Sequence, residues 1–118
     1  MALKRCLMEI GTGVDLSGRD YTKACRRAVK DAIGSNGLSF VRSVGAGPES
    51  MYVEVTVGVA RPNEVDADQV LDALPYGHKS INVVQGGLDM PSYDGSDAIV
   101  IANAALIVSL DLETESPN

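Results

Sequence analysis

The segment Tyr21-Thr-Lys-Ala-Cys-Arg-Arg-Ala-Val-Lys-Asp-Ala-Ile33 carries the clearest structural signal in the chain. Its apolar residues recur at the spacing of one α-helix face, and its basic residues lie on the other side. The preceding Ser17-Gly-Arg-Asp20 has the pattern of a capping box, so Ser17 is predicted as the N-cap, with a hydrophobic staple between Leu16 and Tyr21. Gly34 is predicted at the left-handed position after the last turn. We therefore expect a helix over residues 18–33 that buries one apolar stripe.

Alternating apolar residues predict strands on both sides of this helix. Met51–Val59 has the strongest pattern, because its odd-numbered residues are all Met or Val. Residues 2–10 alternate more loosely, and we expect that strand to end at the glycines Gly11 and Gly13.

The second half of the chain predicts two more strands and a second helix. Asp66-Ala-Asp-Gln69 has capping-box spacing and begins a short helix that runs to about residue 74. Residues 79–85 predict a strand that ends at the Gly86-Gly87 pair, and residues 98–112 predict a last strand with a bulge near Asn103. Residues 89–97 between them are polar and predict a loop, and residues 38–44 are a candidate for a further short strand.

The order β-α-β-α-β-β predicts an α+β two-layer sandwich, with a four-stranded mixed sheet and two helices on one face. Right-handed crossover connections leave few topologies, and the ferredoxin-like and chorismate-mutase-like sandwiches are the leading two. The length of 118 residues fits a single domain over 1–118, in which residues 113–118 form a flexible acidic tail.

Charge and hydropathy exclude several classes of partner. The net charge of −6 removes the cationic surplus that nucleic-acid binding needs. The longest apolar run, residues 98–110, is too short to span a bilayer, so no membrane role is expected. The N-terminal residues lack the apolar stretch of a signal peptide. Cys6 and Cys25 form no CxxC pair, which favours free thiols in a reducing, cytoplasmic setting.

The composition predicts a homo-oligomer. The chain has no Trp and a single Phe, so its core is built from small side chains, and such a domain often gains stability by association. Apolar residues also occur at strand positions that one helical layer cannot cover: Leu3, Leu7, Tyr52, Ile99, Ile101 and Ile107. An exposed apolar patch of this kind usually marks an interaction site.

Gly11-Thr-Gly-Val-Asp15-Leu-Ser-Gly18 is the most distinctive local motif. A strand end that leads into a helix N-terminus suits an anion, and the Asp15 carboxylate already stands there. Leu16 replaces the third glycine of a dinucleotide-binding loop, and no Gly-Lys-Ser/Thr of a P-loop follows. Two interpretations stay open: Asp15 satisfies amides of a tight turn, or it points into a pocket and holds a cation, an amine or a hydroxyl.

The same motif resembles the G-x-G-x-D-x-H-G signature of a family of small conserved hypothetical proteins from bacteria and, with an N-terminal extension, from plants. The resemblance extends along nearly the whole chain, through Leu74-Pro-Tyr-Gly77, Val84-Gln-Gly-Gly-Leu88 and Ile101-Ala-Asn-Ala-Ala105. It implies a fold similar to the C-terminal domain of tubulin and FtsZ, within the chorismate-mutase-like group. Ser17 stands where the signature has His, so a mechanism that needs an imidazole there cannot run in this protein.

Two functions are compatible with these patterns. The first is a small-molecule-binding protein or enzyme with pockets between subunits, in which Asp15 is the polar anchor or general base. Its ligand-binding residues would be Gly11, Gly13, Ser17, Gly18, Gly86, Gly87 and Asn103. The second is a non-catalytic assembly or regulatory module. We expect no metal and no cofactor, because ligand-type side chains are not clustered at metal-binding spacing.

The remaining reactive side chains are expected to be structural. His78 is interpreted as an exposed turn residue, and Cys25 lies on the apolar stripe of the first helix. The acidic residues Asp89, Asp94 and Asp97 are interpreted as a solvated loop.

Overall fold

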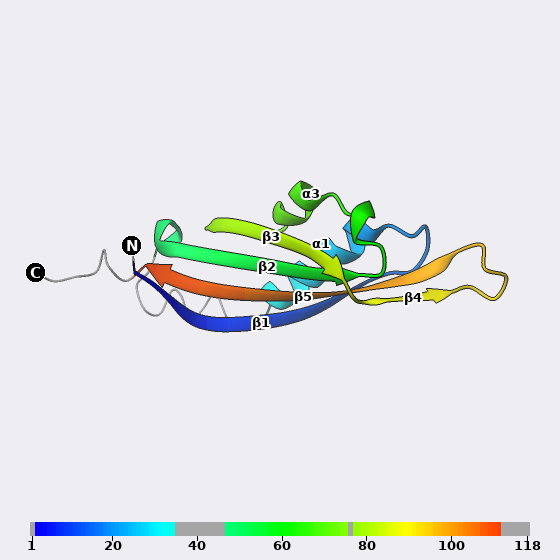
Figure 1. The fold of residues 1–118 in the computed structure, drawn as a ribbon, viewed down its shortest axis with the longest axis horizontal. Helices are drawn as coiled ribbons and strands as arrows, with labels where there is room; N and C mark the ends of the chain where they lie inside the picture. Colours follow the sequence, from blue (N-terminus) through cyan, green and yellow to red (C-terminus); the bar gives the residue numbers. More distant parts are fainter. Residues whose placement is uncertain (1, 35–46, 76, 112–118) are drawn as a thin grey trace, which may run out of the picture.

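The computed structural model describes residues 2–34, 47–75 and 77–111. Four long strands form the body of one mixed sheet in the order β1-β5-β2-β3, and a fifth, β4, pairs with β5. These are β1 (Leu3–Asp15), β2 (Met51–Val59), β3 (His78–Gln85), β4 (Leu88–Pro91) and β5 (Ala98–Asp111). Figure 1 shows β5 between β1 and β2 along most of its length. The α+β class predicted from the sequence is confirmed, with five strands instead of four.

The helices pack on one side of this sheet. The helix α1 (Tyr21–Ile33) contacts β1, β5 and β2, and the shorter α3 (Ala67–Leu71) contacts α1 and β3. Two single 3-10 turns, η1 (Pro48–Ser50) and η2 (Pro62–Glu64), precede β2 and α3. No helix within the described residues is long and apolar enough to cross a membrane.

The core lies between α1 and the sheet. The odd-numbered residues of β2 and the even-numbered residues of β5 point at α1, as the two-residue period of strands requires. On α1 the predicted stripe is buried: Tyr21, Ala24, Cys25, Ala28, Val29 and Ala32. Because the helix presents mainly Ala to the sheet, its axis can lie close to the strands.

That close approach explains Gly11 and Gly13, which lie inside β1 and do not end it. A Cβ atom on Gly11 would lie 2.5 Å from the amide nitrogen of Ala32, and a Cβ on Gly13 would lie 2.8 Å from Cβ of Arg27. The two glycines therefore accommodate the backbone of α1. The prediction that they end the strand was wrong, because the signal comes from tertiary packing.

The start and end of α1 also differ from the prediction. The N-cap is Asp20, whose carboxylate accepts a 2.9 Å hydrogen bond from the Lys23 amide. Ser17 lies three residues earlier in an exposed loop, and Leu16 is 71% exposed, so the predicted staple does not form. Gly34 closes the helix in the right-handed region, at φ −63°, and not in the left-handed one.

Three further predictions are corrected or left open. Asp66 is confirmed as the N-cap of α3, but its amide donates to the Thr22 hydroxyl at 2.9 Å and not to the Gln69 side chain, so the full capping box does not form; α3 ends at Leu71 and not near residue 74. The expected bulge near Asn103 is absent, because Asn103 pairs regularly with Thr12 and Gly58; the register shift lies between Arg5 and Leu7 in β1. The candidate strand at 38–44 and the tail at 113–118 lie outside the described residues.

The predicted polar loop over 89–97 is partly a strand. From β3 the chain crosses the end of β2, where the Gly86 amide donates to the Val59 carbonyl at 2.9 Å. The chain then forms β4, which takes the place of β2 as the neighbour of β5. The last residue of β2 that pairs with β5 is Gly58, opposite Asn103, and two residues further along β5 Ile101 pairs with Leu88 of β4. We call β4, residues 92–97 and the residues of β5 that pair with β4 the arm. The arm extends beyond the helices in Figure 1.

The outer edge of β1 is closed by α1 near the arm. The Thr12 amide donates to the Asp31 carboxylate at 2.9 Å, and the Arg27 guanidinium donates to the Val14 carbonyl at 2.6 Å. Side chains of α1 therefore occupy backbone groups of β1 that a neighbouring strand would otherwise use.

The side of the sheet opposite the helices, which we call the open face, is uncovered. Its exposed apolar residues are Leu3, Met8, Ile10, Val84, Leu88, Met90 and Ile99. Among the residues predicted to need a partner, Ile99 and Ile101 lie here, whereas Leu7 packs against the core.

Candidate functional site

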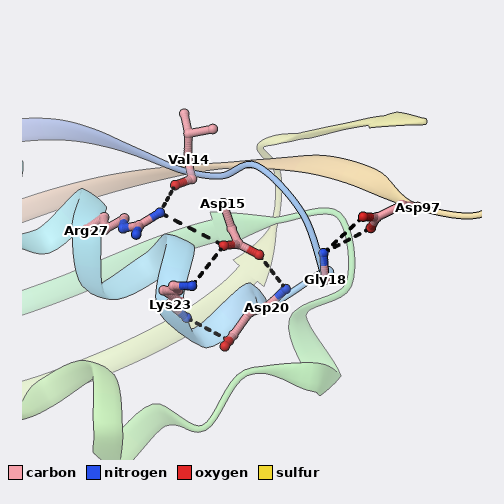
Figure 2. Close-up of polar contacts among 7 residues, drawn as sticks. All are labelled: Val14, Asp15, Gly18, Asp20, Lys23, Arg27 and Asp97. Atoms are coloured by element: carbon pink, nitrogen blue, oxygen red, sulfur yellow. Dashed lines mark hydrogen bonds and ion pairs between the residues drawn. The ribbon is translucent and has the colours of Figure 1, made fainter. Parts of the chain in front are cut away.

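Asp15, the predicted anchor, is the last residue of β1 and points toward the first turn of α1 (Figure 2). It is 2% exposed, and its carboxylate accepts a 2.9 Å hydrogen bond from the Asp20 amide. The N-cap residue thus donates through its backbone to Asp15, while its own side chain caps the helix. Such a carboxylate at a helix N-terminus is stabilised by the free amides and the helix dipole.

Two basic side chains of α1 compensate the charge of Asp15. Lys23 Nζ lies 3.4 Å and Arg27 3.9 Å from the same carboxylate oxygen. Both cations are about half exposed, so solvent screens these ion pairs and each contributes little stability. Both carboxylate oxygens of Asp15 therefore have partners within the same chain. This is the arrangement expected of a carboxylate that stabilises the turn between β1 and α1.

The loop between β1 and α1 is also tied to the arm. The Gly18 amide donates to both carboxylate oxygens of Asp97, at 3.0 and 3.2 Å (Figure 2). Gly18 adopts φ +92° with open space around the position of a Cβ, so the conformation of the turn requires this glycine. Asp97 is thus a partner of the turn and not a free loop acid.

A second carboxylate, Asp89, meets the same end of α1. The Tyr21 hydroxyl donates to one Asp89 oxygen, and the other oxygen is buried without a hydrogen-bond partner within the described residues. Burial, together with the hydrogen bond and the charge of Asp89, raises the pKa of Tyr21. Asp15 and Asp89 both stand opposite Val100 in the sheet, one from each side. No sequence signal links Tyr21 to Asp89, because 68 residues separate them.

The structure separates the predicted site residues into two groups. Asp15, Gly11 and Gly13 lie on the helix side, where α1 fills the space against the two glycines. Asn103 points to the opposite side of the sheet, since it is the exposed partner of Thr12. Within one chain, the sheet therefore separates these two groups of predicted ligand-binding residues.

Gly86, Gly87 and Asn103 do come together, in an open concavity of about 360 Å³ that we call the hollow. Its apolar wall is Ile10, Val84 and Ala105, and Thr56 and Gln85 add polar groups. Its floor is formed by glycines: a Cβ on Gly58 would lie 3.3 Å from Gly86 Cα, and Gly87, at φ +59°, passes against the Ile101 carbonyl. Gly58 is buried beneath Gly86, whereas Gly86 and Gly87 expose their backbone at the bottom of the hollow.

The other candidate side chains have structural surroundings. His78 stacks on Tyr52 with 4.3 Å between ring centroids, and its Nε2 lies 3.0 Å from the Glu49 carbonyl. Burial raises the pKa of the Cys25 thiol to about 12, so it remains protonated. Among the described residues no group of three or more His, Cys, Asp or Glu side chains could hold a metal ion.

Comparisons with known proteins identify a family and a fold. A family model described as conserved hypothetical protein (Lin0512_fam) matches residues 5–108. A solved structure, described as an FtsZ-like protein of unknown function from Nostoc punctiforme, is 36% identical. The alignment covers 94% of this chain and 98% of that one, with a TM-score of 0.81. A comparison with curated proteins finds no match.

Proposed function

Because the chain belongs to the Lin0512 family of conserved hypothetical proteins, whose description names no activity, we propose a function from its own geometry: it is a self-assembling module whose copies associate through the open face. The single observation that carries this proposal is the uncovered apolar surface on one side of the sheet. The contacts of Asp15 support the non-catalytic interpretation, because its carboxylate is buried and has partners in its own chain.

The apolar part of the open face has no charged residue on β1 or β5, and its apolar residues lie on both sides of the polar cross-strand pair Thr12–Asn103. On β1 it runs from Met8 to Val14 and on β5 from Ile99 to Ile107, and its polar members are the neutral Thr12, Thr56, Asn82 and Asn103. The apolar part extends over eight residue steps along β5, at a rise of about 3.3 Å per residue, and over the width of three neighbouring strands spaced about 4.8 Å apart. Its area is therefore roughly 400 Å². The largest apolar patch on a typical soluble monomer has about this size and often has a function.

A second copy is the partner that this surface fits best. The chain carries a net charge of −6, so most of its surfaces repel the same surface of another copy. The apolar part of the open face avoids that repulsion, because it contains no charged strand residue. The charged strand residues on this side of the sheet, Arg5, Glu54 and Asp111, lie toward the end remote from the arm, where Glu54 pairs with Ile107 at the border of the apolar part. Burial of these apolar side chains between two copies removes them from water, and this stabilises the assembly.

Sedimentation velocity at micromolar concentration tests the proposal with the variant Ile10→Asp. Ile10 is 67% exposed, so a charge there leaves the core intact but places a carboxylate in the proposed interface. We expect the wild-type chain to sediment as an oligomer and Ile10→Asp as a folded monomer. The matched control is Asn63→Asp, which adds the same charge at an exposed residue of η2 and should leave the oligomer unchanged. A monomeric wild-type chain, or an Ile10→Asp oligomer of wild-type strength, would refute the proposal.

A further inference from the structure

We propose that the hollow receives the Tyr93 side chain of a second copy, in a two-fold dimer in which each arm reaches the other chain. This inference rests on the proposed self-assembly and specifies its geometry. It is carried by two observations: a fully exposed aromatic side chain at the tip of the arm, and an open concavity lined by glycines and apolar side chains.

The tip of the arm is held in one conformation by its own hydrogen bonds. One oxygen of Asp94 accepts from the Ser92 hydroxyl at 2.9 Å and from the Ser96 amide at 3.0 Å. Ser92 also bonds across the loop, since its amide donates to the Asp97 carbonyl at 2.9 Å. The hydrogen bonds from Ser96 and Ser92 lower the pKa of Asp94 to about 2, so the carboxylate acceptor is ionised at neutral pH.

This ordered loop presents Tyr93 entirely to solvent. An exposed aromatic side chain on a preorganised loop loses little conformational entropy when it binds, and Tyr is among the residues that most often dominate the energy of an interface. Tyr93 at the tip of the arm is therefore accessible for contact with another molecule.

The hollow has the chemistry that a phenol ring requires. Gly86 and Gly87 expose backbone at the floor of the hollow, against which a flat ring can lie. Ile10 and Val84 supply apolar contact for the ring, and the Asn103 amide can both donate to and accept from a hydroxyl. The volume of about 360 Å³ lies at the lower end of the range for small-molecule sites.

Tyr93 cannot reach the hollow of its own chain. Five residue steps separate Asn103 from Ala98 on β5, or about 17 Å, and the β4–β5 pairing holds the tip beyond that point. A two-fold axis through the middle of the arm exchanges these two positions, so each Tyr93 stands over the hollow of the other copy. The same axis brings the exposed side chains of Leu88, Met90 and Ile99 of both copies together at the centre.

The variant Tyr93→Trp reports on this contact, because the chain contains no other tryptophan. At concentrations where sedimentation shows a dimer, we expect blue-shifted tryptophan emission, which moves to that of an exposed indole on dilution to monomer. Asn63→Trp, on the helix side, is the control and should show exposed emission at every concentration. In the double variant Tyr93→Trp/Ala105→Phe the new Phe side chain fills the hollow. The tryptophan emission should then be that of an exposed indole at every concentration.

A second measurement uses no reporter. Tyr93→Ala should weaken dimerisation about tenfold or more, as expected for an interface anchor, while Tyr93→Phe retains most of the affinity. An oligomer of the Tyr93→Trp variant whose indole emission stays exposed would overturn this inference and leave association through the open face intact. Buried emission that Ala105→Phe does not change would also overturn it, since the tip would then dock elsewhere. A wild-type chain that is monomeric throughout would overturn both proposals.

Discussion

The substitution Gly11→Ala tests whether the glycines of β1 serve the packing of α1. A Cβ at this position would lie 2.5 Å from the Ala32 nitrogen and 3.0 Å from its Cα, whereas non-bonded carbon contacts have their optimum near 3.5 Å. The new methyl therefore needs about 1 Å of extra separation between β1 and α1. Its neighbours are backbone atoms of a helix, which cannot rotate away as a flexible side chain does.

The magnitude follows from that displacement. Overpacking of a core costs about 1–3 kcal/mol, and rigid backbone neighbours place Gly11→Ala at the upper end, near 3 kcal/mol. For a domain of this size that corresponds to a fall of roughly 10 °C in the melting temperature. Gly34→Ala is the matched control: its φ of −63° is helical and the nearest atom to a new Cβ is 3.4 Å away. That variant should be neutral or more stable by about 0.5 kcal/mol.

Thermal and urea unfolding, followed by circular dichroism at one fixed protein concentration, measure both variants on the same scale. The fixed concentration is needed because association would add to the apparent stability. If Gly11→Ala unfolds within about 0.5 kcal/mol of wild type, the close packing of α1 on β1 is not what requires glycine there.

Three further outcomes are expected. Asp15→Asn should lower the free energy of unfolding by about 2 kcal/mol. The new amide keeps one oxygen to accept from the Asp20 N–H, but it turns a buried NH₂ group toward the cations Lys23 and Arg27. Stability equal to wild type would contradict a structural role for Asp15. Asp20→Ala should cost about 1 kcal/mol in chemical denaturation, whereas Ser17→Ala should have almost no effect, and the reverse order would return the N-cap to Ser17. A thiol reagent at pH 8 should modify Cys6 in the native chain and spare Cys25, since burial raises the pKa of the Cys25 thiol to about 12 and keeps it protonated; mass spectrometry after unfolding should show both modified.

The elements that the sequence predicts well are those with a dominant apolar period. The stripe of α1 and the alternation of β2 depend only on residue spacing, and both are buried as predicted. The choice of Asp20 over Ser17 as N-cap was not predictable, since both residue types are good caps. Asp15 binds the Asp20 amide from 5 residues away, and Arg19 takes a left-handed φ of 51°, so the chain enters the helix at Asp20.

Long-range contacts account for what the sequence does not show about the candidate site. Lys23 and Arg27 belong to a basic helix face that would normally be solvated, and only the folded chain brings Asp15 between them. The four residues of β4 are too few for alternation to be recognised, so Asp89 was assigned to a loop. The hollow depends on the crossing of Gly86 over Gly58, which is a feature of topology and not of local sequence.

The hydrogen bonds from α1 to the edge of β1 also oppose the addition of a further strand at that edge. A strand that tried to extend the sheet at Thr12 or Val14 would first have to displace the Asp31 and Arg27 side chains. Open-ended growth into fibres proceeds through such free edges, whereas contact between sheet faces can close after two copies. The Arg27 and Asp31 side chains thus oppose strand addition at this part of the β1 edge, and Arg27→Ala together with Asp31→Ala should raise the tendency of the chain to form thioflavin-positive fibrils.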